Sequence, residues 1–166
     1  MRQWDNSHAG LLEVTVIRDD INNALKEAMK ARDDRRVSTL RLINSALKNA
    51  DIDARGQGKG PLGDDEVLGL LQKMIKQRRE SIDLYEKGGR AELAQQERDE
   101  IAIIAAYLPK QMSEDEVKVA IAQAIQETGA VGMKDMGKVI GALKGKYAGK
   151  MDFAKASALV KGTLSG

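Results

Sequence analysis

Apolar residues recur every three or four positions along most of this chain, which is the spacing of one face of an α-helix. Four such runs precede residue 109, and they cover residues 17–31, 37–54, 64–87 and 90–108. The glycine-rich stretch 55–63 separates the second run from the third and predicts a loop. We therefore expect four helices in the first part of the chain.

A change in the pattern follows at Pro109, which predicts the end of the fourth helix because proline cannot continue one. Ser113 and Glu116 then stand at the spacing of a capping box, which opens a helix. Three further helical runs follow, at residues 113–129, 133–147 and from 152 onward. The fold class expected is all-α: a four-helix N-terminal subdomain (17–108) followed by a small three-helix module (113–166).

Residues 1–16 show no clean helical period, and they hold the single Trp and the single His of the chain, Trp4 and His8. We expect this segment to be an irregular head, or a tag or other extension, outside the fold.

The composition is that of a helical protein with an aliphatic core, because aromatic residues make up only 3% of the chain. There is no cysteine, which fits a reducing compartment. No signal peptide is evident, and the longest apolar stretch, 101–108, is far shorter than the ~20 residues that span a bilayer. These features predict a cytoplasmic protein with no membrane partner.

No pattern in the sequence predicts catalysis. Nucleophilic catalysis needs a base beside a Ser or Cys, but the single His lies in the head and no G-x-S-x-G motif exists. The carboxylates alternate with Lys and Arg in the pattern of surface pairs rather than of metal ligands. The glycine-rich stretch 56–63 does not match the motif of a phosphate-binding loop. We expect no catalytic residue, no metal and no cofactor.

One segment has unusual chemistry. Residues 132–166 carry seven lysines against two aspartates, although the formal net charge of the whole chain is only +2. Within it Gly137, Gly141 and Gly145 share one helix face, beside Lys134, Lys138 and Lys144, and next to an apolar face that comprises Met136, Ile140, Leu143 and Tyr147. Each interior glycine costs a helix about 1 kcal/mol relative to alanine. Two interpretations remain open: close approach of a nucleic-acid backbone, or tight packing of a neighbouring helix.

A second basic cluster comprises Lys73, Lys76 and Arg79. Glu80 and Asp83 follow at a distance that allows pairing along the helix, so we interpret the cluster first as a solvated face. The scarcity of aromatic residues argues against stacking on single-stranded bases and favours recognition of the backbone and shape of a folded RNA.

Five stretches, in this order, resemble the YqeY family, the stand-alone relatives of the C-terminal tail of the GatB subunit of the glutamine-dependent aminoacyl-tRNA amidotransferase. The stretches are Arg35–Ile43, Lys73–Ser81, Tyr107–Gln111, Gly132–Gly141 and Asp152–Val160. The similarity runs from about residue 17 to the end of the chain.

This resemblance implies a helical subdomain followed by a GatB-tail-like module that contacts tRNA while the chemistry occurs elsewhere. The positions carried over as candidate tRNA contacts are Lys134, Gly137, Lys138 and Gly141, and we add Lys144 and Lys146 as candidate phosphate contacts. The resulting hypothesis is a tRNA-binding accessory module without its own catalytic site. Two alternatives stay open: an adaptor that docks on an amidotransferase or another translation protein, and a carbon–nitrogen ligase with glutamine as amido-nitrogen donor, as the family association implies.

Overall fold

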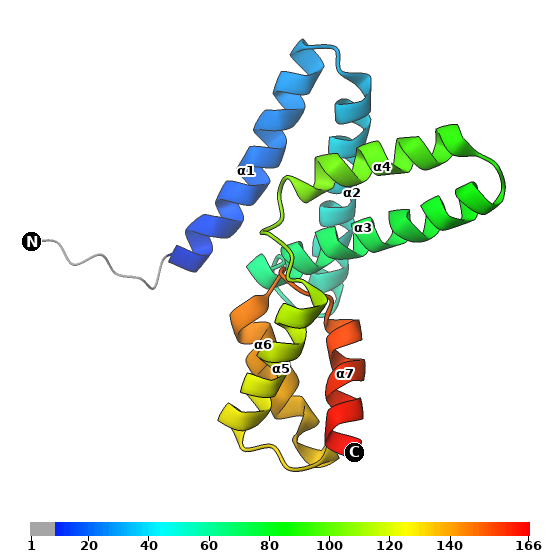
Figure 1. Ribbon diagram of the computed structural model, residues 1–166. Helices are drawn as coiled ribbons and strands as arrows, with labels where there is room; N and C mark the ends of the chain where they lie inside the picture. Colours follow the sequence, from blue (N-terminus) through cyan, green and yellow to red (C-terminus); the bar gives the residue numbers. More distant parts are fainter. Residues whose placement is uncertain (1–8) are drawn as a thin grey trace, which may run out of the picture. The chain divides into compact units, whose positions relative to one another are not determined.

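The computed structural model describes the backbone of residues 9–166 and the side chains from residue 17 onward. This part of the chain contains helices and no strands, so the all-α expectation is confirmed (Figure 1). The chain divides into two compact units between Leu108 and Pro109. The elements of the N-terminal unit are α1 (Ala9–Lys30), α2 (Asp34–Gly56), α3 (Asp64–Lys87) and α4 (Ala91–Ala105). Those of the C-terminal unit are α5 (Glu114–Thr128), the 3-10 helix η2 (Met133–Asp135), α6 (Met136–Tyr147) and α7 (Phe153–Ser165).

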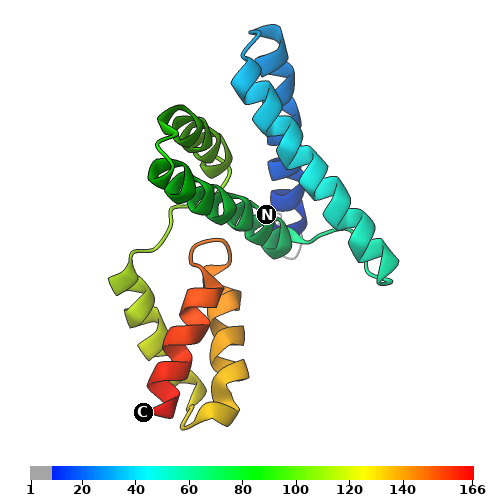
Figure 2. The same ribbon diagram turned by 90° about the vertical axis from the view of Figure 1, so that its right-hand side faces the viewer.

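The N-terminal unit consists of two helical hairpins, α1 with α2 and α3 with α4 (Figures 1 and 2). All four helices contribute to one aliphatic core, in which Ile21, Leu40, Leu71 and Ile104 are fully buried. The core is therefore aliphatic, as the composition predicts.

The irregular head expected over residues 1–16 is wrong for residues 9–16, because α1 begins at Ala9 rather than at Ile17. Once a helix is nucleated, each further residue adds a hydrogen bond at little cost, so a helix can extend beyond its clearly periodic part. The remaining residues of the expected head, with Trp4 and His8, lie outside the described residues.

An ion pair fastens the two helices of the first hairpin. Arg18 on α1 donates two hydrogen bonds of 3.0 Å to the two carboxylate oxygens of Asp51 on α2. Asp51 also accepts a 3.0 Å bond from the backbone N–H of Leu62, in the loop before α3. The pKa of the Asp51 carboxyl is lowered, chiefly by the Arg18 hydrogen bond. One carboxylate thus holds α1, α2 and the following loop together.

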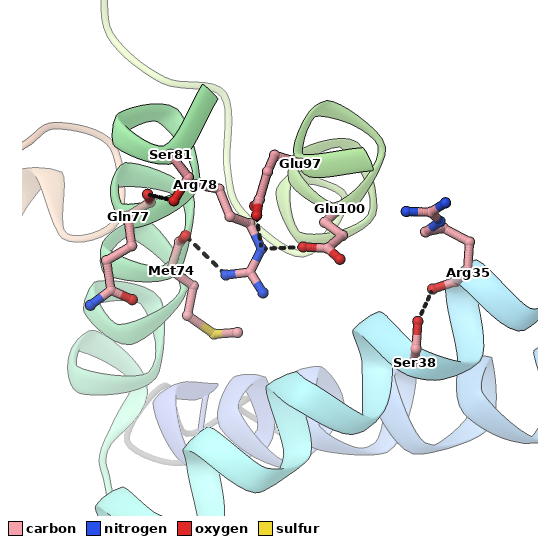
Figure 3. A network of polar contacts seen from close by, with 8 residues as sticks. All are labelled: Arg35, Ser38, Met74, Gln77, Arg78, Ser81, Glu97 and Glu100. Carbon is pink, nitrogen blue, oxygen red and sulfur yellow. Dashed lines mark hydrogen bonds and ion pairs between the residues drawn. The ribbon is translucent and has the colours of Figure 1, made fainter. Parts of the chain in front are cut away.

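A second polar group lies between α3 and α4 and corrects the expectation that the carboxylates form surface pairs (Figure 3). Arg78 on α3 donates from Nε to Glu100 on α4 at 3.0 Å, and Glu100 is 8% exposed. Arg78 occupies a position in the apolar stripe of α3, among Met74 and Ile82, so a counter-charge must reach it from another helix. Spacing within a single helix could not reveal that partner.

The C-terminal unit is a three-helix bundle whose ends are set by local signals. The capping box expected at Ser113 and Glu116 is present: the Ser113 hydroxyl accepts from the Glu116 N–H at 3.2 Å, and the Glu116 carboxylate accepts from the Ser113 N–H at 3.1 Å. At the other end of α5, Gly129 has φ +66°, the left-handed conformation that glycine adopts without strain. These caps fix α5 without help from the other unit.

The segment before α5 is bonded to the loop between α6 and α7. The Met112 N–H donates to the Lys150 carbonyl at 2.8 Å, and the Gln111 side chain donates to the Gly149 carbonyl at 2.6 Å. The sequence pattern predicts a fourth helix that reaches Leu108, whereas α4 ends at Ala105. A turn therefore precedes Pro109, and the residues after it belong to the C-terminal unit.

Candidate nucleic-acid interface

Helix α6 is anchored in the C-terminal unit by one face. Val139 and Leu143 are fully buried, and they belong to a core shared with α5 and α7 that includes Ala120 and Val160. Of the apolar face expected from the sequence, only Leu143 is fully buried; Met136, Ile140 and Tyr147 are half-buried at its edge. The centre of the buried face is therefore displaced toward Val139.

The glycines of α6 lie on the face opposite this core. At about 100° per residue, Gly137, Gly141 and Gly145 are turned away from Val139 and Leu143. All three are exposed, and a Cβ added to any of them would meet no atom of another residue within 4 Å. Tight packing of a neighbouring helix in this unit therefore does not explain them, and that interpretation is wrong.

Three of the predicted lysines accompany this stripe. Lys138 and Lys144 lie on α6 at its two edges, by the same helical spacing, and Lys134 lies in the 3-10 turn that leads into α6. All three side chains are exposed. We call Lys134, Gly137, Lys138, Gly141, Lys144 and Gly145 the glycine–lysine face. Gly145 follows Gly137 and Gly141 at i, i+4, i+8 spacing, although it is not one of the predicted contacts.

Lys146 does not belong to this face. It lies on the side of α6 next to α5, where its Nζ is 2.9 Å from the Glu127 carboxylate. The hydrogen bond from Lys146 to Glu127 raises the pKa of the Lys146 ammonium. Lys146 thus lies on a different side of α6 from the other predicted contacts, and it pairs with Glu127 of the same unit.

The acidic residue between the lysines is tied to the backbone. The Asp135 carboxylate accepts a 3.0 Å hydrogen bond from the Val131 N–H, and this bond, together with weaker attraction to Lys138 and Lys134, lowers the pKa of Asp135. Asp135 therefore closes the turn that presents Lys134 and starts α6.

The second basic cluster lies in the other unit. Lys73, Lys76 and Arg79 are all exposed on α3. The cluster is a separate basic surface on the N-terminal unit.

Comparison with known proteins assigns the family. The sequence model of the family described as Yqey-like protein matches residues 18–164, nearly the whole chain. The chain belongs to the YqeY family. The resemblance inferred from the five sequence stretches is confirmed, and the match includes both units and the whole glycine–lysine face.

Several relatives of this YqeY-family chain are fungal proteins. One from Eremothecium gossypii, named altered inheritance of mitochondria protein 41, mitochondrial, is 40% identical over 84 residues, which are 51% of this chain and 44% of that protein. A protein of the same name from Lachancea thermotolerans is 36% identical over 110 residues, 65% of this chain and 57% of that protein. An uncharacterised protein of Schizosaccharomyces pombe is 30% identical over 111 residues, 65% of this chain and 86% of that protein. The chain spans about half the length of the first two.

The relatives' names correct one expectation. Cytoplasmic localisation, inferred from the lack of cysteine and of a signal peptide, is contradicted because related proteins are named as mitochondrial. A cysteine-free composition reports on redox conditions and does not separate compartments that share them. Within the described residues, no helix combines the length and the apolar character needed to cross a bilayer.

Proposed function

We propose that this YqeY-family protein is a tRNA-binding accessory module that binds through the glycine–lysine face of its C-terminal unit and has no catalytic site of its own. The observation that carries the proposal is the outward direction of the three glycines. Their cost to the helix, about 1 kcal/mol each, is not offset by packing inside the unit. A ligand that comes close to the bare helix surface would offset it.

The charge of the face favours a polyanion as that ligand. Lys134, Lys138 and Lys144 are exposed around the glycines, and lysines that neutralise phosphates gain affinity by releasing counterions. With five aromatic residues in the chain and none on this face, recognition depends on backbone and shape rather than on stacked bases. Folded RNA fits these requirements, and the family resemblance to the GatB tail favours tRNA within that class.

The two remaining hypotheses make different predictions. Under the accessory proposal, amide transfer takes place on a partner enzyme, so the purified protein with glutamine, ATP and misacylated tRNA yields no amidated product. Amidated product would instead support the carbon–nitrogen ligase. An adaptor that docks on a translation protein would keep that protein bound after nuclease treatment, whereas a complex held together by RNA would dissociate.

The decisive experiment is a titration of fluorescently labelled tRNA with the full chain at several salt concentrations. The double variant Lys134→Ala/Lys138→Ala is compared with Lys118→Ala/Lys155→Ala, which removes the same charge from exposed positions on α5 and α7. Each lost phosphate contact lowers the slope of log K against log salt by about 0.7–0.9. We expect a slope smaller by nearly 2 for the first variant and a much smaller change for the second. Equal slopes for both variants would refute the assignment of this face.

A further inference from the structure

The polar group between α3 and α4 contains one cation for two carboxyls (Figure 3). Arg78 Nε is 3.0 Å from Glu100 Oε2 and 3.9 Å from Glu97 Oε2. Its side chain also donates to the Met74 carbonyl at 3.1 Å. The side chains of Arg78, Glu97 and Glu100 are 13%, 20% and 10% exposed. If both carboxyls were ionised, a negative charge without a matching cation would remain in a largely dehydrated space.

The surrounding helices determine which carboxyl keeps its charge. From α3, Arg78 gives its short bond to Glu100, so Glu100 is the better-matched anion. Glu97 is on the same helix as Glu100, one turn earlier, and receives only the longer contact. From α2, Arg35 is drawn beyond Glu100, on the side away from Arg78 (Figure 3). Glu97 is therefore the less compensated of the two carboxyls.

We propose that Glu97 stays protonated at pH values at which exposed glutamates are ionised, while Glu100 is the ionised partner of Arg78. The protonated Glu97 carboxyl then stabilises the packing of α4 against α3. The cluster is then neutral, with one cation, one anion and one neutral acid that hydrogen-bonds its neighbour. Loss of the proton places two like charges side by side and weakens the hairpin.

The electrostatic environment agrees with this assignment. Burial raises the pKa of the Glu97 carboxyl, the Glu100 charge raises it further, and only Arg78 acts in the opposite direction. Because the pKa of Glu97 is higher in the folded protein than in the unfolded chain, the stabilisation is complete below the unfolded value of about 4.3. It is lost as the pH rises through the folded value.

The direct test is an NMR titration of the glutamate carboxyl carbons in the full chain. We expect Glu97 to titrate with a midpoint above that of Glu92, an exposed glutamate on the same helix. A Glu97 midpoint equal to or below that of Glu92 would overturn the proposal, and this measurement needs no variant to fold.

A pair of variants tests whether the Glu97 proton stabilises the packing of α4 against α3. Glu97→Gln keeps a neutral hydrogen-bonding side chain at this position, so its urea midpoint should not fall over the pH range in which wild-type Glu97 ionises. Glu92→Gln is the matched control and should show the same fall as the wild-type protein. If the urea midpoint of Glu97→Gln falls as that of the wild-type protein does, the proton on Glu97 does not stabilise the hairpin and the proposal is wrong.

Discussion

Replacing Gly141 by alanine separates the requirements of folding from those of binding. Gly141 lies in the middle of α6, and an added Cβ meets no atom of another residue within 4 Å. The substitution should therefore stabilise the helix by its propensity alone, about 0.5–1 kcal/mol. For the C-terminal unit alone, Pro109–Gly166, 1 kcal/mol corresponds to a rise in Tm of roughly 4–8 °C, and for the whole chain unfolding together to roughly 2–4 °C.

The effect on tRNA binding should have the opposite sign. If a phosphate backbone lies against the bare surface at Gly141, the new methyl group overpacks the interface, which costs about 1–3 kcal/mol. A cost of 1.4 kcal/mol corresponds to a tenfold weaker dissociation constant. The assay is a pair of measurements on the same protein: thermal unfolding by circular dichroism and a tRNA titration by fluorescence anisotropy.

Two other helical glycines provide matched controls. Gly69 on α3 and Gly162 on α7 are exposed, and a Cβ at either position also meets no atom within 4 Å. Their alanine variants should gain stability like Gly141→Ala but bind tRNA like the wild-type protein. If Gly141→Ala is more stable and binds tRNA as tightly as Gly162→Ala, the close approach of RNA to this face is refuted.

Two further predictions concern stability. Asp51→Asn removes the charge that Arg18 and the Leu62 N–H share, so it should lower the free energy of unfolding at pH 7 by about 1 kcal/mol. Because the pKa of Asp51 is lowered in the folded protein, its contribution is present above the unfolded value of about 3.9 and is lost as the pH falls. In urea unfolding, the difference in free energy between the wild-type protein and Asp51→Asn should therefore shrink toward acid pH. A difference that is constant with pH would contradict this role. Ser113→Ala removes the hydroxyl that accepts from the Glu116 N–H and should lower the free energy of unfolding by about 1 kcal/mol, measured by urea unfolding. Ser113→Thr, which keeps a capping hydroxyl, is the control. Equal urea midpoints for the two variants would contradict the capping role.

The ends of several helices were predictable because their signals are local. The start of α5 depends on Ser113 and Glu116, and its end depends on Gly129, all within the helix or next to it. The start of α1 was not predictable in the same way, because residues 9–16 have no clean period and the helix extends through them from its periodic part.

The candidate site was predictable in composition but not in direction. Helical spacing placed Gly137, Gly141 and the flanking lysines on one face, but whether that face turns inward depends on which neighbouring positions are buried. The sequence pattern predicts Met136, Ile140, Leu143 and Tyr147 as the buried face. Only Leu143 of these is fully buried, and Val139 is buried beside it, so the buried face is displaced and the glycines lie opposite it. The ion pair of Lys146 with Glu127 could not be predicted in the same way, because Glu127 lies on another helix.

The contact of Arg78 with Glu100 shows the same limit. A guanidinium in an apolar stripe indicates that a counter-charge must approach from elsewhere, but one sequence does not say which of many carboxylates supplies it. Pairing between helices is a property of packing, and only the three-dimensional arrangement identifies the partner.

The hydrogen bonds from Gln111 and Met112 to the loop between α6 and α7 have a consequence for how such a unit is inherited. The segment that leads into α5 is therefore held by hydrogen bonds inside the C-terminal unit itself, through Gln111 and Met112. A unit held in this way is portable: a different polypeptide can be joined ahead of Pro109 while the three-helix core and its outward glycines keep their arrangement. A fusion to another polypeptide can therefore carry the same surface without a change in the contacts inside the unit.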